Sequence, residues 1–124
     1  MLTLSPATRI FLAAGPTDLR KSFNGLYSIV VNEIEGSPLS GNLFVFCNRY
    51  RNRIKVLYWD GSGLWVMAKR LEKGTFSWPE TTARSLELTV EELTLLLGGI
   101  DLKATKRRRW YRHRNGERAL LKKF

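Results

Sequence analysis

Three short apolar segments separated by turn signals constrain the fold of this chain more than any other feature. The segments Leu43–Cys47, Ile54–Trp59 and Leu64–Lys69 are rich in β-branched and aromatic residues, which favours strands. Asp60–Gly63 separates the last two, and its glycines supply the positive φ that a tight hairpin needs. A polar, basic loop, Asn48–Arg53, joins the first two. The pattern predicts a three-stranded antiparallel meander.

Helices are expected on both sides of this meander. Apolar residues recur every three or four positions from Leu19 to Ile34, which is typical of one face of an amphipathic helix, and Thr17 or Asp18 is its expected N-cap. Thr89–Glu92 has the capping-box pattern, a hydroxyl followed three residues later by a carboxylate. It predicts a second, shorter helix that ends at a pair of glycines.

Two further short strands are expected, Thr8–Ala13 before the first helix and Thr75–Trp78 after the meander. Together these elements predict an α+β fold: an antiparallel sheet of three to five strands, in the order β-α-β-β-β-α, with one long amphipathic helix packed on it. In the middle strand, Ile54, Val56 and Tyr58 are expected to face this core and the alternate residues to face away. We expect residues 1–102 to form a compact domain and residues 103–124 a basic C-terminal tail.

The composition argues against several classes of protein. Cys47 is the one cysteine and His113 the one histidine, too few for a disulfide within the chain or a structural zinc site. The longest apolar runs have five residues, whereas a membrane span needs about 20. The N-terminal apolar stretch lacks the basic segment of a secretory signal. We therefore expect a cytoplasmic protein that has no contact with membranes.

The charge is the most informative part of the composition. The chain has 21 basic and 11 acidic side chains, a formal net charge of +10. Residues 101–124 hold 10 of the basic and 2 of the acidic side chains, and a second basic zone lies within residues 49–73. Such a charge favours a polyanionic partner, above all nucleic acid. A solvated surface with an ordinary basic tail is the alternative.

Candidate nucleic-acid-binding residues lie in both basic zones. In an extended chain the basic residues at positions 49, 51, 53 and 55 point the same way, as a row that can follow a DNA backbone. In the tail, cations surround two rings that can stack on bases. The candidates are Arg49, Tyr50, Arg51, Arg53, Lys55, Lys69, Arg70, Lys106, Arg107, Arg108, Arg109, Trp110, Tyr111, Arg112 and Arg114.

Arg20 and Lys21 are candidates for a phosphate contact, because they lie in the first turn of the expected helix. Cations there oppose the helix dipole, so a phosphate or a nearby carboxylate is expected to offset them. A turn with two solvated cations is the alternative. No catalytic residue, metal or cofactor is expected, since the histidine lies in the tail and no nucleotide-binding P-loop motif is present.

Five segments, in order from about residue 8 to residue 102, resemble a known family: Ile10–Leu26, Gly41–Arg49, Arg53–Trp65, Lys69–Pro79 and Leu95–Asp101. They are similar to the TnpB-type accessory protein, encoded by the second open reading frame, of the insertion sequence 66 family of bacterial transposable elements. The resemblance implies a non-catalytic accessory role in DNA transposition beside a separate transposase. It also implies that transposase as a partner. Together with the basic charge, it makes DNA the other expected partner, with the element ends as the expected site. A pure protein–protein adaptor without DNA contact is the alternative.

Overall fold

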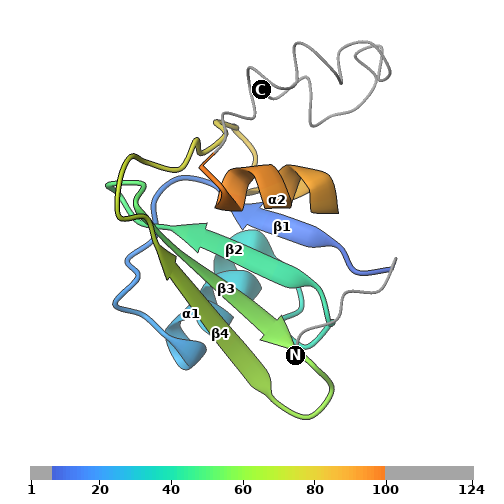
Figure 1. Cartoon of the computed structure of the whole chain (residues 1–124). Coiled ribbons are helices and arrows are strands. Elements are labelled where there is room, and N and C mark those ends of the chain that lie inside the picture. Colours follow the sequence, from blue (N-terminus) through green and yellow to red (C-terminus); the bar gives the residue numbers. More distant parts are fainter. Residues whose placement is uncertain (1–6, 100–124) are drawn as a thin grey trace.

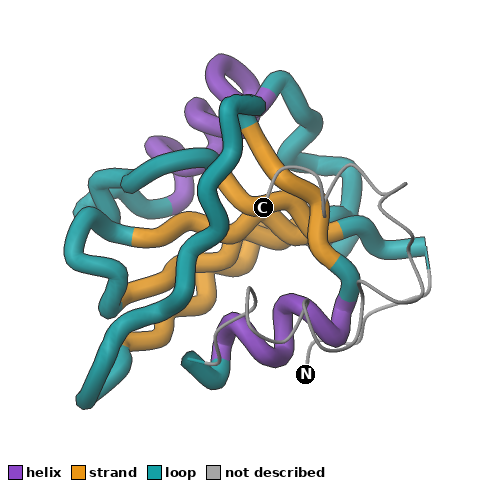
Figure 2. The backbone as a smooth tube through the Cα atoms, turned by 90° about the horizontal axis from the view of Figure 1, so that it is seen from above, coloured by secondary structure: helices purple, strands orange, loops and turns teal. Residues whose placement is uncertain are grey.

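The computed structural model describes residues 7–99 of the 124-residue chain. Its strands form one five-stranded sheet in the spatial order β4-β3-β2-β1-β5, and the helices lie on opposite faces of it (Figure 1; Figure 2). The α+β class is confirmed. In chain order the elements are β1 (Ile10–Ala13), α1 (Phe23–Ile29), a π-helical segment (Val30–Ile34), β2 (Leu43–Cys47), β3 (Arg53–Trp59), β4 (Leu64–Arg70), β5 (Ser85–Leu88) and α2 (Val90–Leu97).

The sheet is mixed, so the prediction of an antiparallel sheet is wrong. β1 and β2 run parallel, with Ile10 opposite Leu43, whereas β2–β3, β3–β4 and β1–β5 are antiparallel pairs. A parallel pair requires a crossover connection, and the segment that contains α1 provides it. The meander of β2, β3 and β4 is confirmed.

The first helix is shorter than predicted and begins later. Its N-cap is Ser22, because the Asp18 carboxylate accepts hydrogen bonds from both the backbone N–H and the guanidinium of Arg20 and closes a separate turn. Seven α-helical and five π-helical residues give 12 in all. Phe23, expected on the buried face, lies in the first turn and is 47% exposed.

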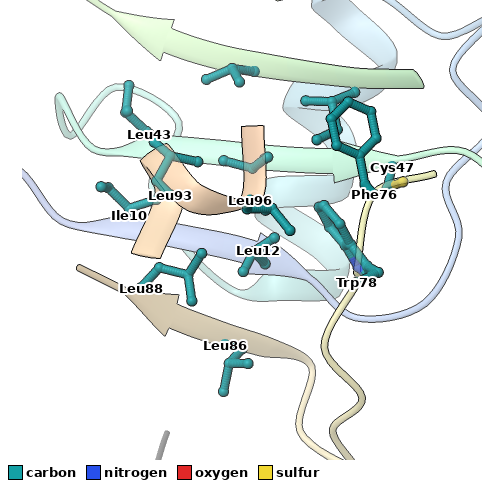
Figure 3. Close-up of a cluster of buried hydrophobic side chains, with 13 residues drawn as sticks. Ile10, Leu12, Leu43, Cys47, Phe76, Trp78, Leu86, Leu88, Leu93 and Leu96 are labelled. Carbon is teal, nitrogen blue, oxygen red and sulfur yellow. The ribbon is translucent and has the colours of Figure 1, made fainter. Parts of the chain in front are cut away.

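Apolar clusters fill both faces of the sheet. On one face Leu26 and Val30 pack with Phe46 of β2 and with Leu57 of β3. Leu57 was expected to face away from the core, but α1 covers that face and leaves the side chain 0% exposed. On the other face α2 covers a second cluster (Figure 3), whose labelled members are Ile10, Leu12, Leu43, Cys47, Phe76, Trp78, Leu86, Leu88, Leu93 and Leu96.

The segment Thr75–Trp78 is a loop, not the predicted strand. Its alternate residues are nevertheless buried, and the Trp78 indole N–H donates to the Ala13 carbonyl at 3.2 Å. The strand that the sequence prediction missed is β5, in which buried Leu86 and Leu88 alternate with less buried residues. β5 has four residues and is followed directly by the N-cap of α2. An alternation of buried and exposed residues over so short a segment is too weak to predict a strand from the sequence.

α2 begins with the predicted capping box. The Glu92 N–H donates to Thr89 Oγ1 at 3.1 Å, and the Thr89 N–H donates to Glu92 Oε1 at 2.7 Å. Thr89→Ala removes the acceptor of the Glu92 N–H, so we expect the free energy of unfolding, measured in urea, to fall by about 1 kcal/mol. Thr89→Ser keeps the hydroxyl and is expected to lose less. Equal losses in the two variants would contradict a capping role for this hydroxyl.

Candidate nucleic-acid interface

A groove of about 1290 Å³ lies at one end of the sheet. Three parts of the chain line it: the loop before α1, the β2–β3 loop with the start of β3, and the end of β4. They meet because β1, β2 and β4 end, and β3 begins, at the same end of the sheet (Figure 1). The charged lining residues are Arg20, Arg49, Arg53, Lys55, Lys69 and Arg70, against Asp18 and Glu72. Six basic and two acidic side chains give the lining a net charge of +4.

Asn48 fixes the β2–β3 loop. Its Oδ1 accepts hydrogen bonds from the backbone N–H groups of Asn52 and Arg53, both at 3.0 Å, and its Nδ2 donates to Asn52 Oδ1 at 2.8 Å. These bonds close a compact loop whose remaining residues Arg49 and Tyr50 are exposed. Arg49 and Tyr50 therefore present a cation and an aromatic ring to the groove from a loop whose backbone is already fixed.

Arg51 does not share this exposed position. It adopts a left-handed conformation with φ of 59°, and its Nη1 donates to the Trp78 carbonyl at 3.1 Å. Its own carbonyl accepts the Phe76 N–H at 2.6 Å. The prediction that the basic residues at 49, 51, 53 and 55 point the same way is therefore wrong, because the chain turns at residue 51. Arg51 instead holds the loop that covers one face of the sheet.

Three basic residues of the strands differ in what they do. Arg53 and Arg70 are opposite each other in the β3–β4 register and are both exposed. Lys55 Nζ donates to the carbonyl of Lys21 at 3.0 Å and so connects β3 to the loop before α1.

Lys69 borders the groove, but its ammonium is engaged elsewhere. Its Nζ donates at 2.8 Å to the carbonyl of Leu97, in the last turn of α2. The bond satisfies a carbonyl at a helix C-terminus, where a cation is favourable. Lys69 thus links β4 to α2, and its ammonium is directed to the helix rather than into the groove.

Two carboxylates pair with arginines of the groove. Asp18 Oδ2 lies 2.7 Å from Arg20 Nη2, and Glu72 Oε2 lies 3.0 Å from Arg70 Nε. Hydrogen bonds from the Arg20 side chain and backbone lower the pKa of Asp18 to about 2, so this carboxylate is charged at neutral pH. The carboxylate expected beside Arg20 is thus present. Arg20 and Lys21 precede α1, so the prediction that they occupy its first turn is wrong, and Lys21 does not line the groove.

Cys47 and Asp60 are two side chains outside the groove whose surroundings give them a structural role. Within residues 7–99 no three His, Cys, Asp or Glu side chains are grouped to hold a metal ion. Burial raises the pKa of the Cys47 thiol to about 11, so it is protonated and a poor nucleophile at neutral pH. Asp60 has a structural role: it accepts four hydrogen bonds, from Ser62, Gly63 and Trp65, in the predicted hairpin turn. Over the same residues, no helix has the length and hydropathy to cross a membrane.

The structure brings together Arg49, Tyr50, Arg53, Lys55 and Arg70, and adds Arg20 to them. The sequence alone did not place Arg20 near the β2–β3 loop, because the path of the crossover between β1 and β2 determines that proximity. The candidates of the C-terminal tail lie outside the described residues: Lys106, Arg107, Arg108, Arg109, Trp110, Tyr111, Arg112 and Arg114.

Comparison with known proteins identifies similar sequences. A family model described as IS66 Orf2 like protein matches residues 8–107. The uncharacterized protein y4jC of Sinorhizobium fredii (strain NBRC 101917 / NGR234) is 36% identical over 108 residues, which cover 87% of this chain and 92% of the relative. The uncharacterized protein y4hO of the same strain is 38% identical over 101 residues, which cover 82% and 88%. No solved structure gives a significant match.

Proposed function

The chain belongs to the IS66 Orf2-like family, and on this premise we propose that it is a non-catalytic accessory protein of DNA transposition that binds DNA through the basic groove. Family membership associates the chain with insertion sequences and supports a role beside the element's transposase. The observation that carries DNA binding is the convergence of Arg20, Arg49, Arg53 and Arg70 on one groove from separate parts of the chain.

The chemistry of these four side chains suits phosphate. An arginine guanidinium is planar, is always charged and can donate two parallel hydrogen bonds to one phosphate. Each phosphate contact also releases counterions, which adds a favourable entropy at low salt. Since Asn48 already fixes the loop that carries Arg49, little conformational entropy is lost there on binding.

A mobility-shift titration of the full chain on duplex and single-stranded DNA at several salt concentrations tests the proposal. Four phosphate contacts alone give a log–log slope of about −3.6 on a duplex, and contacts by other basic residues make it steeper. A protein that acts only as an adaptor of the transposase would not bind DNA at all, or would bind with a slope near zero. Either result would overturn the proposal.

Removing the two carboxylates of the groove is expected to strengthen DNA binding. The double variant Asp18→Asn, Glu72→Gln nearly keeps the shape and leaves one acceptor oxygen on each side chain, and it raises the net charge of the lining from +4 to +6. We expect an affinity about fivefold higher at low salt, because each carboxylate repels a bound phosphate nearby. Fluorescence anisotropy with labelled DNA measures it.

The control for this variant is Glu91→Gln together with Glu80→Gln, which removes the same charge from exposed residues that do not line the groove. We expect this control to change the affinity less than the groove variant does. An equal increase in both variants would mean that net charge, not the groove, determines the affinity.

A further inference from the structure

Tyr50 has an exposure that the fold does not require. It is 73% exposed, the highest value among the exposed large hydrophobic and aromatic side chains of the described residues. The bonds that fix its loop are made by Asn48, Asn52 and Arg51, not by the tyrosine ring. An aromatic ring presented to water on a preorganised loop is well placed to stack on a flat partner.

The surroundings of the ring identify the kind of partner. Tyr50 lines the same groove as Arg49 and Arg53. A ligand that stacks on the ring therefore lies in a groove that also contains these two cations. Aromatic rings combined with a basic groove are the combination by which proteins bind single-stranded nucleic acid, in which every base has an accessible π-face. In a duplex the base faces are stacked on one another and a surface tyrosine cannot reach them.

The size of the groove agrees with a single strand. Drug-sized ligands occupy sites of roughly 300–1,000 Å³, so about 1290 Å³ accommodates a few nucleotides. Arg20 and Arg70, from the loop before α1 and from the end of β4, line the groove together with Tyr50 and can contact the flanking phosphates.

From these observations we infer that the groove binds a short stretch of single-stranded DNA, with Tyr50 stacked on one base and the arginines on the adjacent phosphates. The inference rests on the proposed function and specifies its substrate. Stacking carries no sequence information by itself, so binding tolerates different sequences but requires unpaired bases.

The test is fluorescence anisotropy with the full chain and a labelled oligothymidylate of about a dozen nucleotides, a length within the usual range of such sites, against a duplex of equal length. Tyr50→Ala is expected to weaken single-strand binding about tenfold, because it removes the stacking on one base, and duplex binding by less than about twofold. Tyr50→Phe keeps the ring and is expected to retain the affinity. The salt slope of Tyr50→Ala stays unchanged, since no phosphate contact is lost.

Trp65→Ala is the matched control, because Trp65 is 52% exposed but lies near the start of β4, at the opposite end of that strand from the groove. We expect it to bind the single strand as well as the unchanged protein does. Unchanged single-strand affinity in Tyr50→Ala, or equal losses on single strand and duplex, would overturn the inference and leave the proposed function intact. Tighter binding of oligouridylate than of oligothymidylate would overturn the assignment to DNA. Failure of the unchanged protein to bind any DNA would overturn the proposed function itself.

Discussion

Replacing Arg20, Arg53 and Arg70 together by serine is expected to reduce DNA affinity about a hundredfold at moderate salt. The log–log salt slope is expected to flatten by about 2.7 on a duplex and by about 2.1 on a single strand. All three side chains are exposed and line the groove. We therefore expect each substitution to remove one phosphate contact. The stability should change little, because the ion pairs of Arg20 and Arg70 with their carboxylates are exposed. Anisotropy titrations at several salt concentrations measure both effects.

The choice of these three arginines follows from the structure. A variant chosen from spacing alone would include Arg51, whose guanidinium holds the Trp78 carbonyl, and would mix lost binding with lost stability. The matched control is Arg9→Ser, Lys73→Ser, Arg84→Ser, which removes the same charge outside the groove. Two members of each set carry an exposed ion pair: Arg20 and Arg70 in one, Arg9 and Arg84 in the other. Equal losses in the two triple variants would show that the groove has no special role.

The largest loss of stability is expected from Leu57→Ala. Its side chain is 0% exposed between the sheet and α1, and removing a buried leucine side chain costs about 2–5 kcal/mol. That is a large part of the ~5–15 kcal/mol by which a domain is stable. Leu39→Ala, at a position that is 46% exposed, is the control and is expected to change stability by less than about 0.5 kcal/mol.

Urea denaturation of both leucine variants tests whether α1 covers the second face of the sheet or leaves it solvated. If α1 covers the second face, Leu57→Ala is far more destabilising than Leu39→Ala. If that face were solvated, as the alternation of β3 suggested, the two variants would lose about the same small amount. The second result would contradict the packing of α1 on β3.

The sequence was sufficient wherever local chemistry decides the structure. The β2–β4 meander follows from apolar runs bounded by turn residues, and the Thr89 capping box and the Asp60 turn follow from side chains that bond to nearby backbone. In each case the partners are within a few residues of one another. A single sequence contains that information directly.

Long-range pairing decided the features that the sequence did not predict. The parallel β1–β2 pair depends on the path of the crossover, and β5 is recognisable as a strand mainly because β1 pairs with it. Leu57 appeared solvent-facing because nothing in its strand shows that a helix covers the second face. The Asp18–Arg20 turn removed a full turn from the expected start of the first helix.

The candidate site was likewise predicted in its residue types but not in its long-range contacts. Arg49, Tyr50, Arg53, Lys55 and Arg70 were selected from charge and aromatic content, and the structure places them around one groove. Separating Lys69 from this set required seeing its ammonium on a helix carbonyl. Proximity in the fold, and not residue type, distinguishes a side chain that is available to a ligand from one that holds the structure.

Chemical-shift mapping of the ¹⁵N-labelled full chain with an oligothymidylate tests the groove most directly. We expect the largest amide shifts at residues 17–20, 48–50, 52–55, 68–70 and 72, which line the groove, and small shifts at α2 and β5. Shifts confined to residues beyond 99, or to the face that α2 covers, would contradict the assignment of DNA binding to the groove.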